Sequence, residues 1–299
     1  MNAKTAKILC ELNNDFYRDH HAAFSATRSS PWPGWSICLD VLKRAQAEKD
    51  AREYTGDFPD SCRGDCPDGY PDACQDGFKP SPQDSCRAFS LFDLACGNLR
   101  FETFLASAFP QVTTTFYAVD NCDALAAQAP QAPPVHYQSL DVLDLLLQGQ
   151  RINDHLQAPL CDISVSFGFM HHVPLRKYRE AILQSLIDQT RPGGYVVVSF
   201  WQFLDNRALS DKARITHEHA LAKLGLPQLD ENDCLLGWQD LAHTYRYCHS
   251  FPESEIDRLV GLISPRARQI ARFSSDGRTE NLNTYVILKV PEASSPGDH

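Results

Sequence analysis

Short apolar runs alternate with longer amphipathic stretches along most of this chain. From Ala88 onward, the runs FSLFDLA, TTFYAVD, VHYQSLDV, CDISVSF and GYVVVSFWQF have the length and residue content of buried strands. Between them lie ETFLASAFP, NCDALAAQA, LDLLLQGQRINDHL and LRKYREAILQSLIDQT, which we interpret as helices. Repeated strand–helix–strand units predict an α/β fold with a doubly wound parallel sheet, whose ligands bind at the carboxyl ends of the strands.

The first 87 residues follow a different pattern. Apolar spacing within 1–52 predicts one helix before Ser25 and another from about Trp35, separated by a turn at Pro31–Gly34. We interpret 1–52 as a helical segment that caps the α/β domain. Residues 53–87 are acidic and rich in Gly, Pro and Cys, which indicates a loop insertion.

The C-terminal third also departs from the regular alternation. A polar stretch from Asn206 to Leu262 predicts helical structure, and the runs RQIARFS and NTYVILKV predict two final strands. These elements complete a domain that we expect to span 88–292, with 206–262 as a helical elaboration and 293–299 as a flexible tail. A chain of 299 residues is long enough to bury a sizeable core in one such domain.

The composition is that of a globular protein, because 43% of the residues are apolar and 22% are charged. The net charge of −10 argues against a nucleic-acid partner, which needs clustered Lys and Arg. Much of that charge is local, since eight acids stand against Arg63 and Lys79 between Glu53 and Cys86. This segment carries −6, so the rest of the chain carries only −4 and a local basic face stays open.

The N-terminal run MNAKTAKILCELNNDFY has no apolar core of signal-peptide length, and no apolar run reaches the roughly 20 residues that span a bilayer. We therefore expect a cytoplasmic protein with no membrane partner. In that compartment the eleven cysteines are reduced thiols.

Four cysteines of the insertion form a candidate zinc site, because four thiolates satisfy a tetrahedral structural zinc. Their spacings of three, seven and eleven residues lack the paired C-x2-C arrangement that makes such a prediction specific. A mobile acidic loop is the favoured interpretation, and zinc binding is the alternative. The four residues are Cys62, Cys66, Cys74 and Cys86.

The run LFDLACGNLRF, from Leu91 to Phe101, is a hydrophobic strand that enters a tight turn with one glycine, Gly97. Dinucleotide-binding turns carry G-x-G-x-x-G because two phosphates must approach the backbone. Here Ala95 and Leu99 stand where further glycines are expected, which disfavours a diphosphate and therefore a nicotinamide dehydrogenase. A cofactor without phosphates, which contacts the turn through a ribose and a polar tail, fits better.

With these features the sequence resembles the class I S-adenosylmethionine-dependent methyltransferases. In that family an acid ends strand one before a glycine-containing turn, as in FDLACGNLRF, and another ends strand two, as in FYAVD. A third acid follows strand three, as in SLDV, and RPGGYVVVSFW resembles the turn into strand five. The two closing strands match a terminal antiparallel pair. The resemblance implies a Rossmann-like, mostly parallel seven-stranded sheet and S-adenosylmethionine as the cofactor.

The same resemblance implies a role for each acid. Asp120 would accept hydrogen bonds from the ribose hydroxyls, and Asp141 would lie near the adenine amino group. Asp93 has a second interpretation, as the cap of a helix or turn. The residues implied to bind the cofactor are Asp93, Ala95, Cys96, Gly97, Asn98, Arg100, Asp120, Asn121, Asp141, Val142, Phe167, Gly168, Phe169 and His172.

A narrower resemblance rests on the segments FYRDHHAAFSATRSSPWPGW, SFGFMHHVPLRKYREAI, VVVSFWQF and YRYCHSF. They are similar to segments of the tRNA methyltransferases that esterify carboxymethyl-modified wobble uridine, and of their bacterial relatives. This resemblance implies tRNA as the partner and a carboxylate as the methyl acceptor. A carboxylate is ionised at neutral pH, so the reaction needs no general base. Alignment of the reactants then supplies most of the acceleration, of order ~7–11 kcal/mol.

The resemblance places the acceptor among cationic and aromatic side chains. Arg28 would make a bidentate contact with a carboxylate, and His171 would face the acceptor while His172 packs along the cofactor. Plainer alternatives are a solvated or ion-paired arginine for Arg28, core packing for Trp201 and Tyr247, and a satisfied buried histidine for His249. The paired histidines lack a regular third ligand, so we predict no metal there. The predicted acceptor-side residues are Arg28, His171, Trp201, Arg246, Tyr247 and His249.

Three hypotheses for the function follow. The first is S-adenosylmethionine-dependent methyl transfer to a modified tRNA uridine, and the second is the same chemistry on a small carboxylate or amine metabolite. The third is a non-catalytic cofactor-binding or scaffold relative, because Ala95 and Leu99 depart from the glycine pattern. The oligomeric state and the need for an activating partner subunit stay open.

Overall fold

The computed structural model of the protein describes residues 1–28, 30–55, 89–129, 133–239, 241 and 243–293. The predicted insertion at 53–87, apart from its first three residues, lies outside these ranges, and so do the four cysteines of the candidate zinc site. Most of the predicted tail lies outside them too. Within the described ranges, no helix combines the length and the apolar character needed to cross a lipid bilayer.

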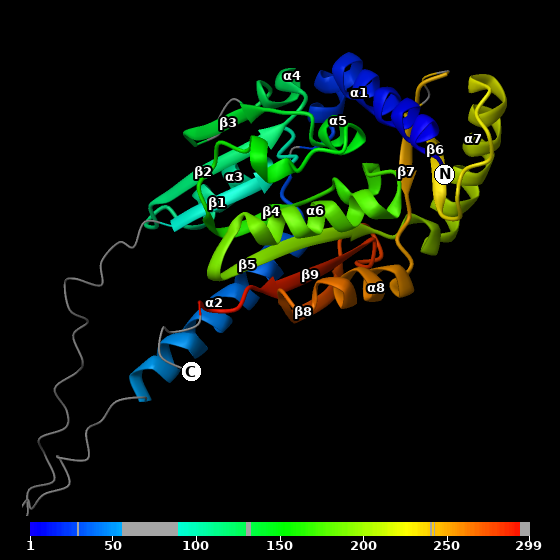
Figure 1. The fold of residues 1–299 in the computed structure, drawn as a ribbon. Coiled ribbons are helices and arrows are strands. Elements are labelled where there is room, and N and C mark those ends of the chain that lie inside the picture. Colours follow the sequence, from blue (N-terminus) through cyan, green and yellow to red (C-terminus); the bar gives the residue numbers. More distant parts are fainter. Residues whose placement is uncertain (29, 56–88, 130–132, 240, 242, 294–299) are drawn as a thin grey trace, which may run out of the picture.

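The centre of the fold is a seven-stranded sheet with the strand order β3-β2-β1-β4-β5-β9-β8 (Figure 1). The first five strands in this order run parallel, and β9 runs antiparallel to β5 and β8. This confirms the predicted doubly wound, mostly parallel sheet. The chain order reverses at β1, and such a reversal is where ligands bind in open α/β sheets. The strands are β1 (Phe89–Leu94), β2 (Thr114–Asp120), β3 (Val135–Ser139), β4 (Cys161–Ser166), β5 (Thr190–Trp201), β8 (Arg268–Ser275) and β9 (Asn283–Lys289).

Helices connect the parallel strands in the predicted order, but two of them are shorter than predicted. The helix expected over Asn121–Ala129 spans only Asp123–Ala126. The helix expected over Leu143–Leu156 ends at Leu147, because Gly149 has a φ of +75° and a separate 3-10 helix follows at Ile152–His155. The helices are α1 (Ala3–Ala26), α2 (Pro33–Thr55), α3 (Arg100–Ala108), α4 (Asp123–Ala126), α5 (Val142–Leu147), α6 (Arg176–Asp188), α7 (Arg207–Leu224) and α8 (Glu253–Ile263), with 3-10 helices also at Met170–His172 and Phe203–Asp205.

Helices cover both faces of the sheet because both sets of alternate strand residues are apolar. In β5, Val196 and Val198 pack in the cluster that contains α6 and α8 side chains. Val197 packs on the opposite face with Trp35 of α2 and Phe101 of α3. Each such side chain contributes about 1.5–3 kcal/mol when fully buried, so the sheet is the middle layer of a three-layer core.

The polar stretch predicted as helical between Asn206 and Leu262 is helical only at its ends. Between α7 and α8 the chain forms an antiparallel hairpin of β6 (Asp233–Gly237) and β7 (Tyr245–His249). The side-chain amide of Asn13 in α1 both accepts from the Tyr247 amide, at 2.7 Å, and donates to its carbonyl, at 3.1 Å. A tertiary contact of this kind stabilises a strand that five residues of local sequence do not specify.

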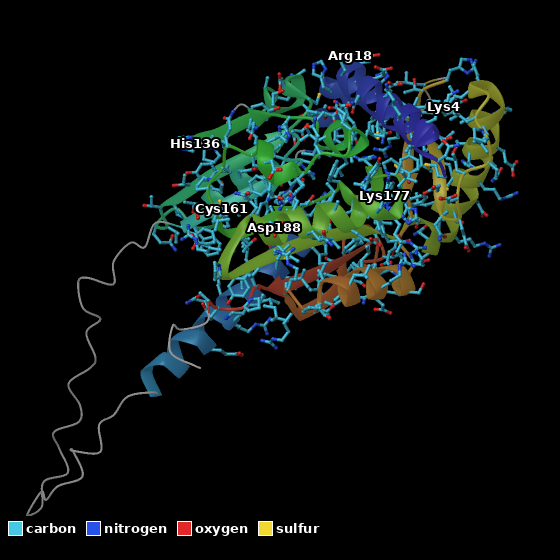
Figure 2. The ribbon with its side chains drawn as sticks, viewed as in Figure 1. Lys4, Arg18, His136, Cys161, Lys177 and Asp188 are labelled. Carbon is cyan, nitrogen blue, oxygen red and sulfur yellow. The ribbon has the colours of Figure 1, made fainter. Side chains whose placement is uncertain are left out.

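The first helix, α1, presents one face to the molecule and one to solvent. Its buried positions recur at three- and four-residue spacing, as expected for an amphipathic helix. Figure 2 shows Lys4 and Arg18 on the outer side. Figure 1 shows α1, α7 and the hairpin gathered at one end of the molecule. This arrangement confirms the two predicted N-terminal helices and brings α1 beside the sheet's ligand-binding edge.

Gly34 tests the packing of α2 on the sheet. A Cβ at Gly34 would lie 2.3 Å from the Tyr285 ring, whereas a Cβ at Gly261, in the exposed last turns of α8, meets nothing within 4 Å. We expect Gly34→Ala to destabilise the protein by about 1–3 kcal/mol through overpacking. Gly261→Ala, the matched control, should stabilise it by about 0.5–1 kcal/mol through helix propensity. Chemical denaturation measures both, and equal effects would contradict this packing.

Candidate active site

A cavity of about 470 Å³ lies at the carboxyl ends of the parallel strands. Its walls come from the residues that follow β1, β2, β3 and β4, and from Trp201 at the end of β5. Further walls come from α1, the start of α2, Arg246 of β7 and the turn between β8 and β9. The cavity therefore joins segments from almost the whole described length of the chain.

The turn after β1 is tied to the end of β2 by Asp120. The Gly97 amide donates to Asp120 Oδ2 at 2.8 Å, and the Cys122 amide donates to Oδ1 at 2.9 Å. Within the turn, Ala95, Gly97 and Leu99 all have left-handed φ angles, of 66°, 58° and 55°. Ala95 and Leu99 thus adopt the backbone conformation that glycine favours, although they carry side chains. The missing glycines change the strain of the turn, not its shape.

A second acid, Asp141, stands at the start of α5. Its Oδ1 accepts from the Leu143 and Asp144 amides, both at 3.0 Å, and so caps the helix. Its Oδ2 accepts from Asn14 of α1 at 2.8 Å and from Asn121 at 3.1 Å. Both carboxylate oxygens therefore already accept hydrogen bonds from protein donors, and the first role of Asp141 is to link α1 to the start of α5.

Asp93 and Glu102 form a buried pair of acids behind the glycine turn. Asp93 is 3% exposed and Glu102 is fully buried. Asp93 Oδ1 and both Glu102 carboxyl oxygens have no hydrogen-bond partner among the described residues. Burial, followed by the neighbouring Glu102 charge, raises the pKa of Asp93 well above its usual range, and burial raises the pKa of Glu102 to about 7. Asp93 caps no helix and faces the cavity.

All fourteen residues predicted to bind the cofactor line this one cavity. They include the backbone segment Ala95–Asn98, the acid Asp120 and the residues Phe167–Phe169 after β4. Arg100 donates to the Ser30 carbonyl at 2.9 Å. The structure thus brings together residues that the sequence separates by as many as 79 positions, from Asp93 to His172.

Four of the six predicted acceptor-side residues also line the cavity, namely Arg28, His171, Trp201 and Arg246. Tyr247 and His249 do not, which corrects their predicted place. Neighbouring residues of a strand point to opposite faces, so Arg246 in β7 faces the cavity while Tyr247 and His249 face away.

The face of β7 that points away from the cavity carries a buried network of charged residues. His249 contacts Asp233 at 2.7 Å through Nδ1 and Glu255 at 2.9 Å through Nε2. Arg179 contacts the same two carboxylates at 3.4 and 2.8 Å, and the Tyr247 hydroxyl donates to Asp233 at 2.7 Å. These residues hold the hairpin against α6 and α8, and so they fix the strand from which Arg246 extends.

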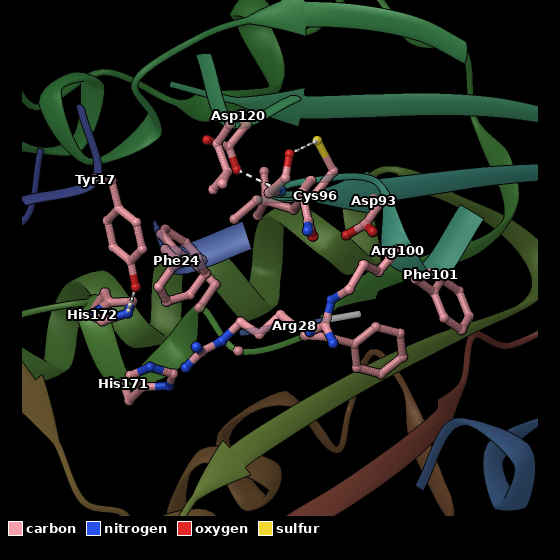
Figure 3. Close-up of a pocket in the computed structure, with 18 of the residues that line it drawn as sticks. Tyr17, Phe24, Arg28, Asp93, Cys96, Arg100, Phe101, Asp120, His171 and His172 are labelled. Atoms are coloured by element: carbon pink, nitrogen blue, oxygen red, sulfur yellow. Dashed lines mark hydrogen bonds between the residues drawn. The ribbon is translucent and has the colours of Figure 1, made fainter. Parts of the chain in front are cut away.

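Most charged groups of the cavity lie in two regions. Asp93 and Asp120 lie in one, and Arg28 lies with His171 and His172 in the other, while a further arginine, Arg100, lies beside Asp93 and near enough to Arg28 to help lower its pKa (Figure 3). Within the described chain, neither Arg28 nor Arg246 has a carboxylate within ion-pair distance, although Arg246 is only 7% exposed. Arg28 stacks over Phe24 at 3.9 Å, and burial together with Arg246 lowers its pKa to about 10. Two cations without a carboxylate partner among the described residues give this half of the cavity a local positive charge.

His172 is neutral and fixed on both ring nitrogens. Nδ1 lies 3.0 Å from the Tyr247 carbonyl oxygen, and Nε2 lies 2.7 Å from the Tyr17 hydroxyl. Because a carbonyl only accepts, Nδ1 carries the proton and Nε2 accepts from Tyr17. Burial and the nearby Arg246 lower the pKa of His172 to about 3. Burial and His172 lower the pKa of His171 well below its usual value.

His171, His172 and Cys248 offer three ligand atoms within 4.8 Å of one another. The surroundings disfavour a cation there, because both nitrogens of His172 already have partners and Arg246 lies close by. Burial also raises the pKa of Cys248 to about 12, which opposes the thiolate that zinc requires.

Sequence reasoning missed most of the α1 contribution to the cavity. Asn13, Tyr17 and Phe24 line it at intervals of four and seven residues, which is one face of a helix, and the predicted Arg28 stands two residues beyond the end of α1. This helical spacing, together with an asparagine on an otherwise apolar face, is the sequence pattern that could have identified these residues. No comparable signal marks the contribution of the β8–β9 turn. The other missed lining residues include Asn14, Thr27, Trp32, Pro33, Trp35, Leu125, Leu143, Asp276 and Asn283.

The chain has the fold of the class I S-adenosylmethionine-dependent methyltransferases. A structure of a SAM-dependent methyltransferase from Methanosarcina mazei is 16% identical and covers 72% of this chain and 100% of its own, with a TM-score of 0.50. DhpI, solved in a complex with SAM and HEP, is 16% identical and covers 94% of this chain and 97% of its own, with a TM-score of 0.52. No protein-family model and no curated protein matches the sequence.

Acid sensitivity tests the environment of His172. The unfolded imidazole binds a proton near pH 6.5, whereas the folded one does so only near pH 3, so stability falls as the pH drops through this window. The slope is up to about 1.4 kcal/mol per pH unit for one such group. We expect His172→Gln to flatten the dependence of the unfolding free energy on pH between 6.5 and 4. His219→Gln, on the exposed face of α7, should keep the wild-type slope, and parallel slopes in all three proteins would contradict this environment.

Proposed function

We propose that this protein is an S-adenosylmethionine-dependent methyltransferase whose acceptor carries an anionic oxygen. The fold supports the enzyme class, and the division of one cavity into an acidic and a cationic half supports the two substrates. The observation that carries the proposal is the pair of cavity arginines, Arg28 and Arg246, without carboxylate partners among the described residues.

The acidic half fits the cofactor. Asp120 stands at the end of β2, where each carboxylate oxygen accepts one backbone amide and keeps a lone pair that could accept from the ribose hydroxyls. Val142 and Leu143 form an apolar wall for the adenine. Oδ1 of Asp93, which has no hydrogen-bond partner among the described residues, could accept from the ammonium of the methionine tail, and the charge of that ammonium would lower the raised pKa of this carboxyl. When bound, S-adenosylmethionine supplies a methyl group activated by its sulfonium.

The cationic half fits an acceptor oxyanion. An ionised carboxylate needs no general base, which agrees with the low pKa values of His171 and His172 and the hydrogen bonds that occupy both nitrogens of His172. The roles of this half are to bind the anion through guanidinium groups, to exclude water with Trp201 and Phe24, and to hold the acceptor in line with the methyl group.

The modified tRNA uridine is our leading acceptor, and a small carboxylate metabolite is the alternative. The segments around Arg28, His171 and Arg246 support the former, because each contributes a residue to the cationic half. Incubation of the protein with labelled S-adenosylmethionine and total tRNA tests this choice. A shift of tRNA that weakens steeply with salt, with label in nucleosides, is the expected result. Absent or salt-insensitive binding would instead favour the metabolite.

Asp120→Ala tests the cofactor half. Loss of the carboxylate should weaken S-adenosylmethionine binding by about 1.5–3 kcal/mol, as for other hydrogen bonds to charged groups. Asp123→Ala is the matched control, because Asp123 is exposed three positions further on and contacts Tyr137 outside the cavity. Calorimetry with S-adenosylmethionine and S-adenosylhomocysteine measures both variants. Failure of the wild type to bind either compound would leave only the scaffold hypothesis.

A further inference from the structure

Trp238 lies behind both cavity arginines. It follows β6 directly, is 8% exposed and does not line the cavity. The guanidinium carbon of Arg28 lies 5.3 Å from its ring centroid, and that of Arg246 lies 5.2 Å from it. The rings of Phe16 and Phe24, both from α1, pack on the same indole at 5.5 and 5.6 Å.

This arrangement addresses a physical problem in the cationic half. Two guanidinium groups in a buried site repel each other, and burial and Arg246 together lower the pKa of Arg28. A carboxylate partner would relieve the repulsion, but it would also accept the N–H groups that an acceptor needs. An aromatic face attracts a cation through its quadrupole and accepts none of the in-plane N–H donors.

We propose that Trp238 is a positioning residue, which holds Arg28 and Arg246 as a pair without occupying their N–H groups. The N–H groups that do not already bond Thr27 or Tyr17 are then available to one anionic group of the acceptor. The inference rests on the proposed function, because it concerns the same cavity. Two contacts distinguish it from simple core packing: Arg246 also lies 5.5 Å from the Phe16 ring, and Arg28 lies 3.9 Å over Phe24. Trp238 is therefore the centre of an aromatic support shared by both cations.

The test uses the full-length protein loaded with S-adenosylhomocysteine, and benzoate and benzamide as probes of equal shape and different charge. Ligand-observed NMR titration gives both dissociation constants. The wild type should prefer benzoate by at least about fivefold. Trp238→Leu should lose about tenfold in benzoate affinity, with benzamide and S-adenosylhomocysteine affinities unchanged within twofold. Trp238→Phe, which keeps an aromatic face, should stay within about threefold of the wild type.

Two controls separate positioning from stability. Leu235→Ala removes a fully buried side chain from the same hairpin strand, in the cluster that holds Tyr247, and should leave benzoate affinity unchanged. Site-specific fluorinated tryptophans at position 238 keep the size of the ring while weakening its negative face. Benzoate affinity should fall stepwise with each added fluorine, which tests the inference even if Trp238→Leu does not fold.

Several results would overturn the inference. They are equal losses for benzoate and benzamide, no trend with fluorination, a loss in Leu235→Ala as large as in Trp238→Leu, or no preference for benzoate in the wild type. Failure of the wild type to bind S-adenosylhomocysteine would overturn the proposed function instead. The two failures are therefore distinguishable.

Discussion

The carboxylate of Asp120 holds the ligand-binding edge of the sheet in its shape. By accepting the Gly97 and Cys122 amides, it joins the turn after β1 to the turn after β2. This bond network explains how Ala95 and Leu99 keep left-handed backbone angles, each at a cost of order 1–2 kcal/mol. Strain of this size persists where the surroundings over-determine the conformation, and Asp120 supplies that constraint. The acid thus shapes the pocket before it contacts any ligand.

The remaining architecture separates charge around that turn. Acids stand at the carboxyl ends of β1 and β2. Arg28 follows the end of α1 and Arg246 comes from the β6–β7 hairpin, two segments outside the seven-stranded sheet and its connections, whereas Arg100 begins α3. The hairpin is itself held by the network of Asp233, Glu255, Arg179 and His249, on the side of β7 away from the cavity. The parallel sheet thus supplies the cavity acids at the ends of β1 and β2, and elements added to it supply Arg28 and Arg246.

The sequence predicted the parts that depend on local pattern and missed those that depend on distant partners. Asp93, Gly97 and Asp120 were predictable because each stands at a strand end next to a turn. The β6–β7 hairpin was not, because Asn13, 234 positions from Tyr247, pairs with its backbone. Tyr247 and His249 were wrongly assigned to the cavity. Alternate residues of a strand point to opposite faces, and the sequence did not show which set faces the cavity. No sequence pattern indicated a role for Trp238, because the residues that contact it come together only in the folded chain.

The helix α1 contacts both halves of the cavity through adjacent asparagines. Asn14 donates to Asp141 on the acidic side, and Asn13 bonds the backbone of β7 on the cationic side. The free energy of packing α1 against the rest of the molecule therefore contributes to the stability of both halves of the cavity. A ligand that displaced or ordered α1 from one side would therefore also affect the other side, and any such coupling would be reciprocal by thermodynamic linkage.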